Sequence, residues 1–454
     1  MKKIISLIMC LTISVVFISC SKDTKTNEDS NNKNTSTESK YKKDIEISID
    51  ENLILENLKK LCENVRNYGS VGEKISADYL KGKLEEYGYV VEFQEFPVYK
   101  STFESTLHVK NNKDYFRLNP YNSEKKGTGK NIIGKRDNHS NEKKTIYLTA
   151  HYDTTDFTKG VIDNGTGTTV ILEVARQLRN YDSPFNIEIV FFSAEEYHRS
   201  GSKYFVSKLT EEEKKNTLGC INVDMVGEKG AGDIVMGLVN QENNVMTVML
   251  NESLENKLKI SHGGSSDDLS FYFREIPVIT LLNEKPNFKI DEKEDQFPYV
   301  DSEQLKNTAY VISNFLTNFN MDTYNKIVNG DKIYSSNKKV DKIGEVNGFK
   351  LNKINAYPIK SGYDSVTEYE YINKNGKKYI LTEKDKVFIN LEDYGEFKPV
   401  TGNNDWSYSI SKDSKYNTKV FYSTAMYFGE IKGDISIEEA MNILKVYSKK
   451  YFYY

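Results

Sequence analysis

Two adjacent acidic residues, Glu195 and Glu196, stand just beyond an apolar segment of the chain. Residues 187–192 are mostly β-branched or aromatic, which predicts a buried strand that ends beside the two carboxylates. Carboxylates at the end of a buried strand are costly to desolvate unless something compensates their charge. A metal ion would compensate it, and one of the pair could then act as a general base. Taken alone, the same pair could equally be a solvated strand end.

Further acid and imidazole groups lie on either side of this segment. His151 and Asp153 end an earlier predicted strand, Asp163 opens a predicted helix, and Asp224 sits in a third predicted strand. Each could be structural by itself: a buried histidine, a turn with a helix N-cap, or a paired buried acid. Because groups at the ends of successive strands converge at one edge of an α/β sheet, the full set in this order favours a functional site.

Four ordered motifs carry a resemblance to a known family. They are HYD at 151–153, GVIDNGTG at 160–167, FFSAEEYHRSGS at 191–202 and NVDMVG at 222–227. With these motifs the chain resembles the co-catalytic zinc aminopeptidases, the aminopeptidase Y and bacterial leucyl aminopeptidase group. The resemblance runs from about residue 53 to about residue 319 and includes the helix–helix–strand opening.

The resemblance implies a site with two zinc ions. It assigns His151 and Asp224 to one zinc, Asp163 to a position that bridges both ions, and Glu196 to the second zinc. Histidine and carboxylate groups are ordinary zinc ligands, and a catalytic site leaves a position for water.

The resemblance also implies two catalytic roles. Glu195 would be the base that takes a proton from the bridging water. Asp153 would hold the second ring nitrogen of His151 and so select its tautomer. The implied activity is hydrolysis of peptide bonds by an aminopeptidase, although carboxypeptidases and dipeptidases share this type of site. The implied substrates are peptides.

One expected ligand has changed. In the family the fifth ligand is a histidine in a segment like HTPxD before the closing helix, and here residues 291–295 read DEKED, which places Asp291 at that position. No histidine follows His262 in the chain. An SDH-type segment has also changed, because Asp268 stands where its histidine is usual.

Three interpretations follow from the missing histidine. First, Asp291 ligates the metal directly; the more negative ligand set then favours an alkaline optimum, or Mn²⁺ or Co²⁺ in place of zinc. Second, the peptidase fold has lost its second metal and the protein is a non-catalytic surface binding protein. Third, His262 swings into the site. A single-zinc enzyme resembling glutaminyl cyclases is a further alternative.

Alternating helix and strand patterns predict how these residues are positioned. Predicted helices cover 53–65, 73–87, 165–178, 245–258 and 302–319, and predicted strands cover 89–98, 131–134, 144–150, 187–192, 218–226 and 276–282. Ser200 is expected to open another helix as its N-cap. This alternation predicts an α/β fold with a mostly parallel central sheet flanked by helices, as in zinc peptidases.

The chain changes character after about residue 322. Residues 330–430 read as short strands separated by turns, with a hairpin at Asn375-Gly376, and a last helix is predicted over 435–451. We expect a zinc aminopeptidase-like domain at 47–322 and a small α+β domain at 323–454. The sequence leaves three roles open for this second domain: to form a wall of the site, to bind substrate, or to bind another protein.

The N-terminus resembles a bacterial lipoprotein signal. Two lysines precede an apolar run over 4–18, and Ser19-Cys20 is followed by a polar stretch. We expect a signal peptide at 1–19, lipid on Cys20, and a flexible tether at 20–46. The predicted location is the extracytoplasmic side of the cell membrane, with secretion as the alternative.

Composition bears on nucleic-acid binding and on the state of the cysteines. The net charge of −4 gives no indication of nucleic-acid binding. After removal of the signal and acylation of Cys20, only Cys62 and Cys220 remain, and both are expected to be buried thiols. His198 is expected to be exposed or to face substrate. The oligomeric state is not indicated.

Overall fold

We analysed a computed structural model of the chain. It describes residues 44–100, 124–136, 143–239, 243–263, 266–286, 295–329, 344–358, 365–385, 396–400, 403–411, 418–423 and 427–450. Asp291, His108, His139 and the predicted signal peptide lie outside the described residues, as does nearly all of the predicted tether.

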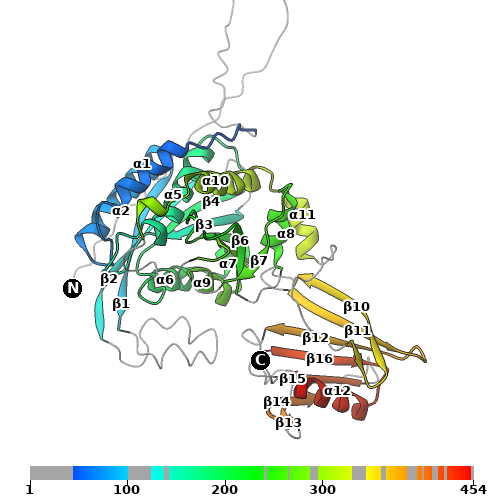
Figure 1. Ribbon diagram of the computed structural model, residues 1–454. Coiled ribbons are helices and arrows are strands. Elements are labelled where there is room, and N and C mark those ends of the chain that lie inside the picture. Colours follow the sequence, from blue (N-terminus) through cyan, green and yellow to red (C-terminus); the bar gives the residue numbers. More distant parts are fainter. Residues whose placement is uncertain are drawn as a thin grey trace, which may run out of the picture. The chain divides into compact units, whose positions relative to one another are not determined.

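An eight-stranded sheet carries the motif-bearing part of the chain (Figure 1). Its order is β1-β2-β4-β3-β5-β8-β6-β7, and the central strands β4, β3, β5 and β8 are parallel to one another. The strands are β1 (Val90–Tyr99), β2 (Lys125–Arg136), β3 (Thr145–His151), β4 (Asn186–Phe192), β5 (Thr217–Val223), β6 (Ile234–Leu238), β7 (Ile260–His262) and β8 (Val278–Asn283). The predicted mostly parallel sheet is therefore confirmed.

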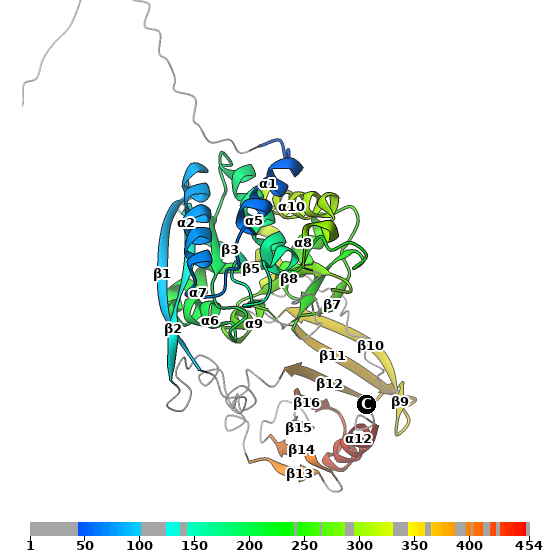
Figure 2. The same cartoon turned by 60° about the vertical axis from the view of Figure 1, so that its left-hand side comes forward.

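Helices cover both faces of this sheet, as both views show (Figures 1 and 2). One face carries α1 (Glu51–Leu61), α2 (Val71–Glu86), α5 (Gly167–Leu178) and α10 (Ser302–Thr317), and the other carries α6 (Ser200–Lys208) and α9 (Asp268–Phe273). Alternate strand residues serve the two faces, since Leu148 lies in the larger core and Tyr147 in the smaller one. The other helical segments are η2 (Val161–Thr166), α7 (Glu211–Asn216), α8 (Val245–Glu252), η3 (Phe297–Tyr299) and α11 (Met321–Val328).

At two helix ends, side-chain contacts explain a departure from the prediction. Ser200 is the first residue of α6 rather than its N-cap; its hydroxyl donates to the Tyr197 carbonyl, and the preceding Arg199 has a left-handed backbone. Helix α8 stops at Glu252, short of the predicted 258. The Asn251 side chain accepts the Leu258 N–H at 2.9 Å and donates to the Leu258 carbonyl at 3.2 Å, which folds that segment back instead.

A second eight-stranded sheet forms from residues 345–433, and all of its neighbouring strands are antiparallel. The predicted hairpin is present, with Ile372 opposite Lys378 and Gly376 at φ +77°. This sheet has its own core with α12, which confirms the predicted α+β fold. The elements are β9 (Glu345–Val346), β10 (Phe349–Pro358), β11 (Ser365–Asn373), β12 (Lys378–Asp385), β13 (Lys398–Val400), β14 (Asn403–Ile410), β15 (Thr418–Ser423), β16 (Tyr427–Gly433) and α12 (Ile437–Lys450).

Helix α11 crosses the predicted domain boundary after residue 322. Tyr324 and Ile327 of this helix are buried in the core of the first sheet, and the Tyr324 hydroxyl donates to the Leu218 carbonyl at 3.0 Å. We therefore place the end of the first domain beyond α11.

The structure also shows the state of the two cysteines and the character of the helices. Cys62 and Cys220 are buried free thiols, as expected. Among the described residues, no helix is both long and apolar enough to cross a membrane.

Candidate metal and catalytic site

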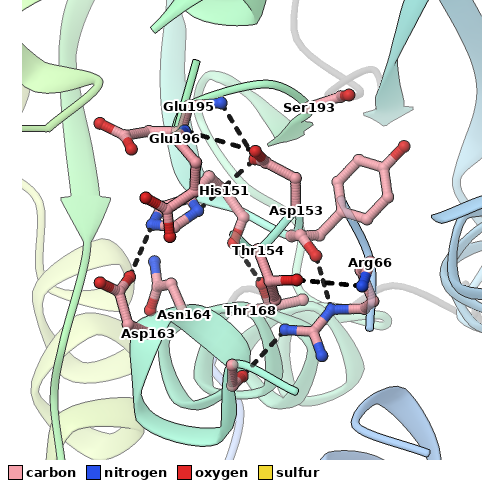
Figure 3. Close-up of polar contacts among 12 residues, drawn as sticks. Arg66, His151, Asp153, Thr154, Asp163, Asn164, Thr168, Ser193, Glu195 and Glu196 are labelled. Atoms are coloured by element: carbon pink, nitrogen blue, oxygen red, sulfur yellow. Dashed lines mark hydrogen bonds and ion pairs between the residues drawn. The ribbon is translucent and has the colours of Figure 1, made fainter. Parts of the chain in front are cut away.

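The predicted site residues gather at the carboxyl ends of the parallel strands. His151 is the last residue of β3, Glu195 and Glu196 follow β4, and Asp224 directly follows β5. In Figure 3, His151 lies between the Glu195–Glu196 segment and Asp163. The parallel registers of β4, β3 and β5 bring their ends to one edge of the sheet, as a crossover fold requires.

His151, Asp163 and Asp224 form a compact group of ligand atoms. Nε2 of His151 lies 3.1 Å from Oδ1 of Asp163 and 3.4 Å from Oδ1 of Asp224. One ligand atom from each of the three residues lies within 4.8 Å of the others. Glu196 is not a member of this group, and Asp291 lies outside the described residues.

These residues suit a divalent cation. His151 is 1% exposed, and the buried Oδ1 of Asp224 accepts no hydrogen bond within the described part of the chain. Burial disfavours a charged imidazole, yet Asp224, Asp153 and Asp163 together raise the pKa of His151 well above its ordinary value. The surrounding carboxylates therefore favour a positive charge at this position. A proton on His151 provides that charge, and a bound cation would provide it in place of the proton.

Asn164 holds the neighbouring ligands in place. Its Nδ2 donates to the Val223 carbonyl at 2.8 Å, and its Oδ1 accepts the Met225 N–H at 3.3 Å. Val223 and Met225 flank Asp224, and Asn164 itself follows Asp163. One buried amide therefore links the loop that carries Asp163 to the strand end that carries Asp224.

Asp163 lies within η2 but has a non-helical backbone, and a second acid holds this segment and the one before it. Its backbone is extended (φ −108°, ψ 96°), and α5 begins at Gly167, two residues later than predicted. Asp295 accepts the Ile162 N–H and, at 3.0 Å, the Thr158 hydroxyl. Burial raises the pKa of Asp295 to about 6.

Asp153 links the ends of β3 and β4. Its two oxygens accept the backbone N–H groups of Glu195 at 3.0 Å and Glu196 at 3.3 Å. Its Oδ1 lies 3.6 Å from Nδ1 of His151, which is an ion-pair distance longer than a hydrogen bond. The structure therefore connects Asp153 to the acidic pair more directly than to the imidazole.

Glu195 has three acidic neighbours. Burial raises the pKa of Glu195 well above its usual range, and the neighbouring Asp267, Glu196 and Asp224 add to this increase, whereas His151 opposes it. Asp267 is fully buried, and burial raises its pKa to about 7. A nearby cation would lower such values because it stabilises the charged carboxylates.

Glu73 is a buried acid that the sequence alone did not single out. It accepts hydrogen bonds from the Ser193 hydroxyl and from the Gly69 N–H, and the Tyr152 hydroxyl lies 3.3 Å away. Burial raises its pKa to about 7, and the nearby Asp153 adds to the increase. Glu73 thus joins the first turn of α2 to the segments that follow His151 and precede Glu195.

Arg66 is a second buried charged residue near the site that sequence reasoning missed. Its guanidinium is fully buried and donates to backbone carbonyls of the segment between His151 and Asp163 (Figure 3). Nothing in the local periodicity marks Arg66, whereas the capping pattern Ser70-x-x-Glu73 could have pointed to Glu73.

His198 and His262, the other two histidines in the described part of the chain, stay outside the ligand group. His198 is exposed, as predicted, and His262 is exposed on β7. Asp268, which stands at the usual histidine position of the SDH-type segment, is 2% exposed in the first turn of α9.

Comparison with known proteins finds similarity over the part of the chain that carries the site. Residues 131–316 match the sequence pattern of Peptidase family M28. The chain is 30% identical over 198 residues to Aminopeptidase YwaD of Bacillus subtilis (strain 168), an overlap of 41% of this chain and 44% of that protein. The chain spans less than half the length of the curated relatives that it matches first.

Solved structures share the fold. A zinc aminopeptidase from Bacillus subtilis superposes with a TM-score of 0.52 at 19% identity, covering 60% of this chain and 95% of that one. A Bacteroides thetaiotaomicron glutaminyl cyclase bound to N-acetylhistamine gives a TM-score of 0.50 at 18% identity, covering 60% and 99%. At such identities the likeness concerns the fold alone. Residues 131–316 of the chain therefore carry the sequence pattern of Peptidase family M28, within a fold shared with zinc aminopeptidases.

Proposed function

We propose that this protein is a zinc-dependent metallopeptidase that releases residues from the N-terminus of peptides on the extracytoplasmic side of the membrane. The observation that carries the proposal is the compact group of ligand atoms from His151, Asp163 and Asp224, in which the imidazole is buried and the two carboxylates are partly exposed. His151 and Asp224 would hold one zinc, and Asp163 would be shared with a second ion that Glu196 and Asp291 would hold. Bound zinc would supply Lewis acidity and orientation for the scissile carbonyl.

Glu195 would perform the proton transfers. It stands beside the ligand group on a segment that Asp153 holds by two backbone N–H groups. We propose that it takes a proton from the attacking water and then delivers that proton to the leaving amine.

The substitution Glu195→Gln tests this role. Gln keeps the shape of the side chain but cannot accept the proton, so turnover should fall about 10²–10⁴-fold while zinc content per chain stays the same. Glu212→Gln, a change at an exposed glutamate of α7, is the matched control. Full activity of the Glu195→Gln variant would exclude this mechanism.

The choice of peptide tests the aminopeptidase assignment. An aminopeptidase should cleave peptides with a free N-terminus and spare their N-acetylated forms, whereas amidation of the C-terminus should matter little. The reverse pattern would indicate a carboxypeptidase, and sensitivity to both changes would indicate a dipeptidase.

A single-zinc cyclase is the second candidate. It is favoured by Asp291 at the position where the second metal's histidine is expected. Formation of pyroglutamate from peptides with N-terminal Gln, with one zinc per chain and no hydrolysis, would establish this alternative. Two metal ions per chain together with amino-acid release would exclude it.

A further inference from the structure

Arg66 places a full positive charge in the interior beside the site. It lies between α1 and α2 and is 0% exposed. Burying a guanidinium is costly unless its donors are satisfied. No carboxylate among the described residues forms an ion pair with it; its hydrogen-bond acceptors are backbone carbonyls instead.

Those carbonyls belong to the two ends of one loop. Nε donates to the Tyr152 carbonyl at 2.6 Å, Nη2 donates to the Gly160 carbonyl at 2.9 Å, and Nη1 donates to the Lys159 carbonyl. The backbone N–H of Arg66 also donates to the Thr154 hydroxyl oxygen at 3.0 Å. The guanidinium therefore closes the loop over residues 152–160.

This loop connects the first two metal ligands. His151 is held by the hydrogen bonds of β3. Asp163 lies outside any strand, so its position is set by the conformation of the 152–160 loop. Closing a free loop carries an entropic cost. If a clamp closes the loop before the metal binds, that cost no longer weakens metal binding.

Gly160 shows how tightly the loop is closed. Its φ is +55°, and a Cβ atom at this position would lie 3.0 Å from Nη2 of Arg66 and 2.4 Å from the Asp163 carbonyl oxygen. Only glycine fits such an approach without rearrangement. The clamp thus reaches the backbone within three residues of Asp163.

We propose that Arg66 is a positioning residue for the metal site: by clamping both ends of the 152–160 loop, it preassembles His151 and Asp163 for zinc. Arginine suits this task because its planar fork presents five donors, whereas lysine offers one ammonium group that cannot span three carbonyls in this arrangement. The inference rests on the proposed zinc site, although it concerns metal binding rather than the reaction.

The test compares Arg66→Lys with Arg136→Lys. Arg136, the last residue of β2, is a matched control because it is also buried and donates to two backbone carbonyls, those of Leu178 at the end of α5 and Tyr181. It pairs with Ile187 near the start of β4, at the opposite end of that strand from the site. Zinc affinity would be measured on metal-free protein by competition with a chelator, together with the melting temperature without metal.

We expect Arg66→Lys to weaken zinc binding about 10–100-fold, the range typical of residues that orient metal ligands. Arg136→Lys should lower the melting temperature comparably and leave zinc affinity within twofold of the parent. A folded Arg66→Lys variant with parental zinc affinity would overturn the proposal.

Two further outcomes keep the test decisive. If Arg66→Lys does not fold, Thr154→Val removes one contact of the same clamp; a threefold or larger loss of zinc affinity supports the proposal, and an unchanged affinity overturns it. If the parent protein binds zinc but cleaves no peptide, the peptidase proposal fails, and the affinities still decide the role of Arg66.

Discussion

The carboxylate of Asp153 accepts the backbone N–H of Glu195 across 3.0 Å. The end of β3 therefore sets the position of the residue that we propose as the base, although 42 residues separate the two in the chain. The intervening Ala194 has a left-handed backbone (φ +55°), so the segment that carries Glu195 turns sharply and needs such an anchor.

Replacing Asp153 with Asn should separate this anchoring role from zinc binding. An amide has one acceptor oxygen and no charge, so it can satisfy only one of the two N–H groups of Glu195 and Glu196. We expect kcat to fall about 10–100-fold with little change in KM, which is the range typical of residues that orient metal ligands through hydrogen bonds. Steady-state kinetics and zinc content would check this, and a kcat within twofold of the parent would contradict it.

The amide of Asn164 should prove equally important for metal binding. Asn164→Asp keeps the shape but replaces the donor to the Val223 carbonyl with an oxygen, which leaves a buried carbonyl unsatisfied and costs about 1–3 kcal/mol of unfolding free energy. Zinc affinity should fall as well, because the strand end that carries Asp224 shifts.

Asn244→Asp supplies the control for that substitution. Asn244 is also buried, donates to the Val278 carbonyl at 2.9 Å, and accepts the N–H groups of Met246 and Thr247 at the start of α8. Denaturant unfolding should show a similar loss for both variants, whereas zinc affinity should change only for Asn164→Asp. Equal zinc affinities would show that the amide of Asn164 has no special role.

Glu73 should make stability depend on pH. Its pKa rises from 4.5 in the unfolded chain to about 7 in the folded protein, so between these values the folded state holds a proton that the unfolded state has lost. Unfolding free energy should therefore fall as the pH rises from about 4.5 to about 7, by about 3 kcal/mol at most. Glu73→Gln cannot ionise, and its denaturation profile should lack this decline. An identical decline in both proteins would assign the effect to another group.

Gly160 should tolerate no side chain. Gly160→Ala adds a Cβ atom at a left-handed backbone position, which costs about 1–2 kcal/mol before any clash with the Thr154 side chain is counted. Gly230→Ala is a fair comparison, because Gly230 has φ +84° but open space around it. Calorimetry should show a larger loss of stability for Gly160→Ala, and chelator competition should show weaker zinc binding for that variant alone.

The sequence by itself determined the elements and the chemistry that they carry. Helix periodicity, the hairpin turn at Gly376 and the buried strand before Glu195 all depend on residues a few positions apart, so they can be read along the chain. The placement of His151 at a strand end follows from the same reasoning, because parallel strands bring their carboxyl ends to one edge. The strand that carries Asp224 was predicted to run to residue 226, whereas β5 ends at Val223.

Only the tertiary structure decided what holds those side chains in place. Arg66 meets the Gly160 carbonyl across 94 positions, and Glu73 meets Ser193 across 120. Backbone carbonyls occur at every residue and carry no sequence signal, so no local pattern could assign one to Arg66. The capping of α6 was mispredicted for a related reason: Ser200 has the right chemistry for a cap, but the turn that connects Glu195 to the helix places Arg199 in that position.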